Sequence, residues 1–203
     1  MTQADQLVKS DRWRVCLFCG SSAGRRPEYA QAASSLGLEL AQRGFGLVYG
    51  GANVGLMGIA ADACLSAGGE VTGVMPRLLV EKEVAHLGLS QLHVVESMHQ
   101  RKALMAELSD AFVALPGGFG TFDELCEILT WAQLGMHSKP VGLLNVSGYF
   151  DALLALFDHA VAEGLLKPVH RELVLTDSSV EGLLNQLEQA PQRAPVGKWL
   201  DKI

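Results

Sequence analysis

Residues 116–124, with the sequence PGGFGTFDE, hold three glycines in four positions directly after the apolar run 111–115. Such a run is typical of a buried strand, and apolar residues recur at helical spacing from Leu125 onward. Glycine lets the backbone approach a ligand closely. The first N–H groups of a helix attract an anion. This strand, turn and helix therefore predict a binding site for a phosphate group.

A purely structural hypothesis for the same residues competes with this one. Thr121 and Glu124 have the spacing of a capping box, in which the threonine hydroxyl caps the helix and the glutamate reaches back to the threonine N–H. On that hypothesis Glu124 only stabilises the helix. The glycines favour the anion site, because a capping box does not need them.

A helix expected from Met98 to Leu108 carries an arginine among its apolar residues. Arg101 lies three residues after Met98 and four before Met105, so it falls on the apolar stripe. A guanidinium there needs an anionic partner, because burying an unpaired charge is costly. Two simpler roles stay open for Arg101, a stem that reaches solvent or a pair with a structural carboxylate. Lys102, beside it, is expected to face solvent.

Strands and helices are expected to alternate along the chain, which predicts an α/β fold, a Rossmann-like parallel sheet with helices on both faces. The expected strands are 14–19, 46–49, 70–75, 91–95, 111–115, 140–145 and 173–175. The expected helices are 27–43, one ending near 65, 98–108, 121–136, 149–165 and 178–189, and 76–90 is expected to be an irregular loop. Ligands bind such sheets at the carboxyl ends of the strands. Ser22, Asn53, Gly55, Gly118 and Thr121 are therefore expected to line one crevice.

Size and composition indicate one domain without nucleic-acid or membrane partners. The 203 residues, 49% of them hydrophobic, suffice for one core. We expect a single domain over 13–190, a flexible leader over 1–12 and a tail over 191–203. The net charge is −6 with scattered basic residues, and no apolar run has the length of a membrane span. The N-terminus lacks a signal peptide's apolar segment, so we expect a cytoplasmic protein.

Cofactor and metal signatures are weak. Cys16 and Cys19 have C-x-x-C spacing, but a zinc site would need a second pair and a redox pair usually starts a helix. The glycine-rich turn 50–58 contains neither the dinucleotide fingerprint nor the P-loop pattern. We therefore expect no metal and no cofactor.

Three motifs in order resemble one known family. Residues 116–124 match the signature P-G-G-x-G-T-x-x-E, 98–102 match M-H-x-R-K, and 55–58 match G-L-M-G. The chain resembles the LOG ("lonely guy") family, the cytokinin riboside 5'-monophosphate phosphoribohydrolases, from about Val15 to Leu166. Ala52 departs from the pattern, since the family often has a third glycine there.

The resemblance implies hydrolysis of the N-glycosidic bond of AMP or an N6-substituted AMP, to free base and ribose 5-phosphate. It implies that Arg101 and Glu124 are catalytic, and that the protein forms a homodimer or a higher homo-oligomer. The family's nucleotide-binding positions correspond to Glu83, Arg101, Lys102, Gly118, Phe119, Gly120, Thr121, Phe122, Asp123, Glu124 and Thr130. Ser22, Asn53, Gly55 and Met98 complete the candidate substrate-binding residues.

Two other functions stay open from the sequence. The crevice could hold a nucleotide or a phosphorylated cofactor without turnover. Lysine decarboxylase is a label this family has carried, and Lys139 superficially resembles a cofactor lysine. However, Lys139 precedes a strand and so belongs to the wrong end of the sheet, and pyridoxal enzymes need a larger fold.

Overall fold

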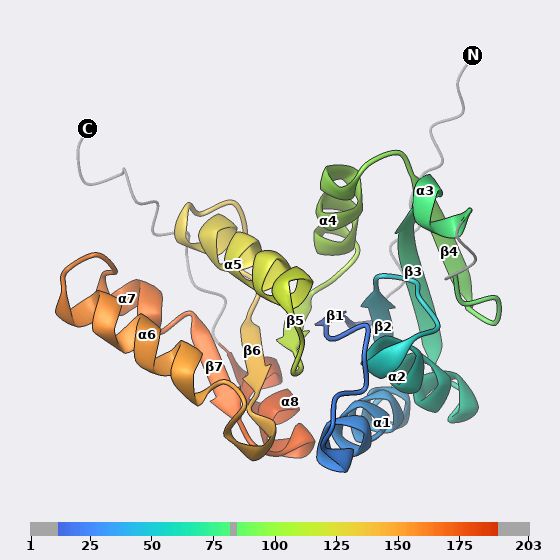
Figure 1. The fold of residues 1–203 in the computed structure, drawn as a ribbon, viewed down its shortest axis with the longest axis horizontal. Helices are drawn as coiled ribbons and strands as arrows, with labels where there is room; N and C mark the ends of the chain where they lie inside the picture. Colours follow the sequence, from blue (N-terminus) through green and yellow to red (C-terminus); the bar gives the residue numbers. More distant parts are fainter. Residues whose placement is uncertain (1–11, 82–84, 191–203) are drawn as a thin grey trace.

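The computed structural model describes residues 12–81 and 85–190, which form one seven-stranded sheet covered by helices (Figure 1). The strand order is β4-β3-β2-β1-β5-β6-β7, and every neighbouring pair is parallel. The strands are β1 Arg14–Phe18, β2 Gly46–Tyr49, β3 Glu70–Pro76, β4 Gln91–Val95, β5 Ala111–Ala114, β6 Val141–Leu144 and β7 Val174–Asp177. The expected Rossmann-like parallel sheet is confirmed.

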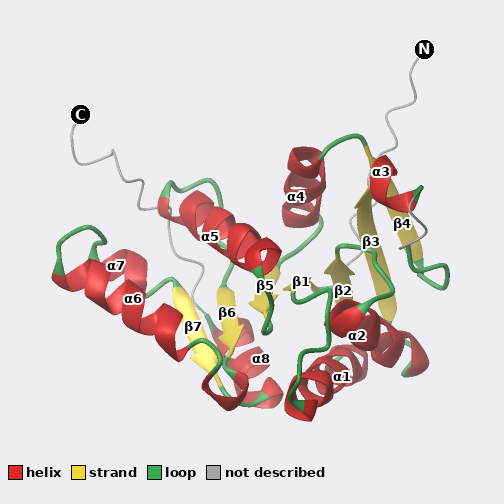
Figure 2. Ribbon diagram, viewed as in Figure 1, coloured by secondary structure: helices red, strands yellow, loops and turns green. Residues whose placement is uncertain are grey.

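Helices cover both faces of the sheet, as predicted (Figure 2). They are α1 Pro27–Gln42, α2 Gly55–Ser66, α3 Arg77–Val80, α4 Met98–Glu107, α5 Phe119–Gln133, α6 Asp151–Ala162, α7 Pro168–Arg171 and α8 Val180–Gln189. On one face, α1, α2 and α8 pack against alternate residues such as Val15 and Leu17 of β1. On the other, α4, α5 and α6 pack against Cys16 and Phe18. Because both faces are buried, β1 is apolar at nearly every position.

Some element boundaries differ from those expected. The 76–90 segment is not wholly irregular, because α3 follows Pro76, which provides an extended N-cap. Helix α6 begins at Asp151 rather than at residue 149, after a 3-10 turn at Val146–Gly148 in which Ser147 has a φ of 52°. Helix α5 begins at Phe119, two residues before the expected start. The expected leader and tail lie almost wholly outside the described residues.

The topology creates a switch point beside β1. The chain leaves β1 toward β2 on one side and returns through β5 on the other. The connections that follow these three strands therefore diverge at the same edge, which is where ligands bind in open parallel sheets. The glycine-rich turns after β1, β2 and β5 all lie there.

We expect the close packing of α1 on α2 to depend on Gly37. A Cβ atom at this position would collide with the Ala60 carbonyl oxygen and lie 2.9 Å from the Cys64 nitrogen. Gly37→Ala should therefore lower the free energy of unfolding by about 1–3 kcal/mol, as overpacking does. Urea denaturation measures this, with the exposed Ser34→Ala on the same helix as control. Equal stability of the two variants would contradict the close approach.

Candidate active site

Three glycine-rich turns meet at the carboxyl edge of the sheet. The Gly20 N–H donates to the Pro116 carbonyl (3.0 Å), and the Leu56 N–H donates to the Gly20 carbonyl (3.1 Å). Gly55 has a φ of 57°, and a Cβ there would collide with the backbone of Ser21. The turns after β1, β2 and β5 are thus joined backbone to backbone. This arrangement brings the Ser22 and Gly55 segments together, as the sequence predicts.

The N-terminus of α5 is exposed and does not form a capping box. Its N-cap is Gly118, no side chain caps it, and Thr121 lies inside the helix. The capping-box hypothesis for Thr121 and Glu124 is therefore wrong. Gly118, Phe119 and Gly120 are exposed, and a side chain added at Gly118 or Gly120 would meet no atom within 4 Å, so a ligand can approach this turn.

Gly117 fixes the shape of this turn. A Cβ there would collide with the Thr121 hydroxyl, and the Tyr149 hydroxyl donates a hydrogen bond to the Gly117 carbonyl. Thr121 is buried, so its side chain holds the turn from beneath. These contacts fix the backbone of the turn where α5 begins.

Arg101 projects inward from α4 and meets Glu124 of α5. Its Nη1 lies 3.4 Å from the Glu124 Oε1, and the two side chains are 12% and 10% exposed. Its Nε donates to the Val74 carbonyl of β3 (3.1 Å). A Cβ at Gly50 would collide with Nη2, so the second glycine turn leaves room for the guanidinium. Arg101 therefore does not extend into solvent, and Glu124 does not cap the helix.

Burial changes the acidity of Glu124. Desolvation raises the pKa of its carboxyl to about 7, and the Arg101 charge opposes this rise. Asp123 raises the pKa further and Lys102 lowers it. A carboxyl that titrates near neutral pH inside a crevice is typical of a functional group.

Lys102 does not face solvent, contrary to the expectation. Its Nζ lies 3.0 Å from Asp123 Oδ2 and 3.0 Å from Glu127 Oε2, and its side chain is 12% exposed. These two ion pairs connect α4 to α5 next to the Arg101–Glu124 contact. Lys102 therefore contributes to how the two helices are held together.

Some of the remaining candidate residues lie near the Arg101–Glu124 pair or the glycine turn, and others lie elsewhere. The Met98 sulfur lies 3.9 Å from Arg101 Nη1. Phe119, at the mouth of the turn, is 93% exposed. By contrast, Phe122 packs against the core, and Thr130 is exposed, with its hydroxyl donating to the Cys126 carbonyl. The structure does not bring these two side chains to the Glu124 carboxylate.

Two further candidates sit in the glycine turns, and one is not described. The Ser22 hydroxyl accepts from the Gly24 N–H (3.3 Å), and Asn53 is exposed beside Gly58. Glu83 lies outside the described residues.

Sequence reasoning missed Gly50, Glu127 and Tyr149 as neighbours of the site. Glu127 follows Glu124 by three residues and so shares a helix face with it. That spacing could have identified it. Gly50 and Tyr149 carry no comparable local signal, because their contacts depend on how distant elements pack.

The C-x-x-C pair is buried beneath the site. Cys16 and Cys19 are free thiols, and burial raises the pKa of both far above the ordinary value. Reactive cysteines need a stabilised thiolate. The environment of this pair is that of core residues.

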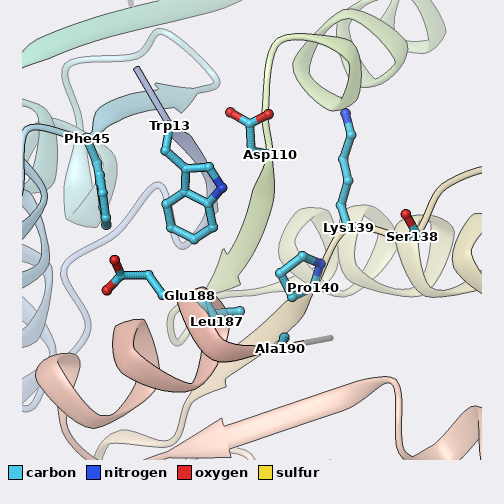
Figure 3. A pocket seen from close by; sticks show the side chains of 9 residues that line it. All are labelled: Trp13, Phe45, Asp110, Ser138, Lys139, Pro140, Leu187, Glu188 and Ala190. Atoms are coloured by element: carbon cyan, nitrogen blue, oxygen red, sulfur yellow. The ribbon is translucent and has the colours of Figure 1, made fainter. Parts of the chain in front are cut away.

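A cavity of about 560 Å³ lies at the opposite edge of the sheet (Figure 3). Trp13, Phe45, Asp110 and Lys139 are among its lining residues. The Lys139 ammonium reaches toward α4 and donates to the Ala106 carbonyl (2.7 Å). Lys139 is thus at the amino ends of the strands, away from the glycine turns, as expected.

Solved structures share this fold at low sequence identity. The molybdenum cofactor binding protein from Rippkaea orientalis matches with a TM-score of 0.66 and 24% identity, over 88% of this chain and 98% of that one. The Moco carrier protein from Chlamydomonas reinhardtii matches with a TM-score of 0.67 and 22% identity, over 88% and 96%. These likenesses show the fold alone.

Sequence relatives are much closer. The cytokinin riboside 5'-monophosphate phosphoribohydrolase LOG7 of Arabidopsis thaliana is 49% identical over 90% of this chain and 84% of its own. The probable cytokinin riboside 5'-monophosphate phosphoribohydrolase LOGL9 of Oryza sativa subsp. japonica is 53% identical over 87% and 78%. A family model described as "Possible lysine decarboxylase" matches residues 57–187. The chain therefore belongs to the family of the LOG phosphoribohydrolases.

Proposed function

We propose that this protein hydrolyses the N-glycosidic bond of nucleoside 5'-monophosphates such as AMP or N6-substituted AMP. The products are the free base and ribose 5-phosphate. Relatives that share about half of their aligned residues with this chain are named for this activity. Within the molecule, the observation that carries the proposal is the buried contact of Arg101 with Glu124, next to an open helix N-terminus.

The 5'-phosphate is held at the start of α5. Gly118, Phe119 and Gly120 at this N-terminus are exposed, no side chain caps it, and the helix dipole adds to the attraction for a dianion. Because the phosphate is remote from the bond that breaks, its binding energy fixes the ribose in place for reaction. This requires no cofactor.

Glu124 faces the sugar one helical turn further along α5. Breaking a glycosidic bond builds positive charge on the ribose ring in an oxocarbenium-like transition state. The ionised Glu124 carboxylate stabilises that charge, and Arg101 stabilises the negative charge that develops on the departing base. The contact between the two side chains holds both in position before the substrate arrives.

Non-catalytic binding accounts for the site less well. A protein that only binds a phosphorylated ligand gains nothing from burying a carboxylate beside the phosphate, because the desolvation of that group is costly. A lysine decarboxylase activity fits the site even less well than non-catalytic binding, because Lys139 lies at the other edge of the sheet.

The cytoplasmic location expected from the sequence stays a prediction. Within residues 12–81 and 85–190, none of the helices combines the length and the hydropathy that a membrane span requires.

We further propose that the protein is a homodimer or a higher homo-oligomer. Large apolar side chains are exposed at the start of α5, just beyond its end and on α6, among them Phe119, Met136 and Leu156. Helix α6 has apolar residues along its length yet buries none of them fully. A second copy of the chain would cover such a surface.

The activity is tested with Glu124→Gln and Arg101→Met, assayed by release of adenine from AMP. Both variants remove a charge that acts in the transition state, so kcat should fall by at least about 100-fold. The exposed Glu163→Gln is the control and should match the wild type. Folded variants that release adenine at the wild-type rate would show that the pair is structural.

The pH dependence of kcat/KM should follow the ionisation of Glu124. Its pKa is raised to about 7, and the ionised form is the active one. Activity should therefore fall as pH decreases through about 7, well above the range where an ordinary glutamate protonates. Steady-state kinetics between mildly acidic and mildly basic pH measure this. A constant rate down to pH values near the ordinary glutamate pKa would contradict the role.

The oligomer is tested by light scattering coupled to size-exclusion chromatography. The wild type should elute as a dimer or larger, and Leu156→Glu or Met136→Glu should weaken the assembly, because either places a charge on the exposed apolar surface. Glu163→Gln serves again as control. A monomeric wild type at micromolar concentration would contradict the proposal.

A further inference from the structure

A small niche lies beside Glu124 between α5, α4 and the end of β1. Its lining comprises Phe18, Lys102, Glu124, Glu127, Ile128 and Trp131. The lining residues of α5 lie close to one stripe of that helix, because they follow Glu124 after about one and two turns. The niche offers about 10 Å³ of room for the centre of a water molecule. That room suits about one water.

The chemistry of the lining also suits a water. A buried water makes two to four hydrogen bonds. The Glu124 and Glu127 carboxylates can accept its two O–H groups. Lys102 can donate a third bond, because its ammonium has three N–H groups and its ion pairs with Asp123 and Glu127, at 3.0 Å each, engage two of them. The rings of Phe18 and Trp131 also line the niche.

The niche and Arg101 are separate neighbours of Glu124. Arg101 is fixed by the Val74 carbonyl of β3 and by the space at Gly50, and it does not line the niche. The cation for the departing base and the pocket for a water are therefore separate neighbours of one carboxylate. Hydrolysis needs this separation, because water must approach the sugar from the side that the base does not occupy.

We propose that this niche supplies the water molecule consumed in the reaction, and that Glu127 and Lys102 position it against Glu124. The inference rests on the proposed function. The water oxygen bonds to C1' of the ribose as the bond from C1' to the base nitrogen breaks. One water proton passes to Glu124, which later releases it, and the electron pair of the broken bond leaves with the base, which takes a proton from solvent. Glu127 is then a positioning residue.

Competition with methanol tests the proposal, because a niche with about 10 Å³ of room should admit water more readily than the larger methanol. AMP is hydrolysed in aqueous methanol, and adenine, ribose 5-phosphate and methyl ribose 5-phosphate are quantified by mass spectrometry. The wild type should form almost no methyl product. Glu127→Ala enlarges the niche, so the methyl share should rise at least about 10-fold, while kcat falls about 100-fold with little change in KM.

Two further variants complete the experiment. Glu127→Gln keeps an acceptor oxygen and the size of the niche, so it should still exclude methanol and lose only about 10-fold in kcat. Glu107→Gln, an exposed change on α4, should match the wild type in both rate and product ratio. Circular dichroism confirms that each variant is folded.

The possible failures are distinguishable. A wild type that forms the methyl product in proportion to the methanol present would show that the nucleophile comes from open solvent, and this overturns the inference while the proposed function stands. Glu127→Ala and Glu127→Gln with wild-type rates and product ratios would do the same. A wild type that releases no adenine overturns the proposed function itself.

Discussion

Burying the carboxylate of Glu124 is the costly step on which the rest of the site depends. Such a group is stable in the folded protein only if a cation and a fixed geometry compensate for its lost hydration. Arg101 supplies the cation, and the Val74 carbonyl and the missing side chain at Gly50 fix its position. The compensation is incomplete, since the pKa of Glu124 remains near 7. A carboxyl balanced in this way can change its protonation state during a reaction cycle at neutral pH.

The glycines serve this geometry by steric exclusion as much as by flexibility. Gly50, Gly55 and Gly117 each occupy a place where a Cβ would collide with another turn or with a functional side chain. Gly118 and Gly120 are different, because open space surrounds them. The first group lets the turns after β1, β2 and β5 pack closely and leaves room for Arg101, and the second leaves the helix N-terminus exposed. One motif therefore combines a packing role and a binding role.

The sequence predicts the sheet well because each strand is a short apolar run, and the local pattern suffices for that. It predicts the contents of the site less well. The local capping-box pattern predicts a start of α5 at Thr121, whereas the actual N-cap depends on the packing of Thr121 beneath Gly117. The sequence places Lys102 in solvent because nothing in its own helix shows that α5 brings two carboxylates to it. The position of Arg101 on an apolar stripe is visible in the sequence, but its partner depends on how α4 packs on α5.

Charge changes sign along the first turns of α5, and this gradient can orient a substrate by itself. The N-terminus offers N–H groups and a positive dipole end, while Asp123, Glu124 and Glu127 follow, paired among the described residues with Arg101 and Lys102. A phosphate dianion is attracted to the first region more strongly than to the second, where three acids offset two cations. A ribose ring that becomes positive experiences the reverse. The order of charges along one helix therefore favours the orientation with the phosphate at the N-terminus and the ribose beside Glu124.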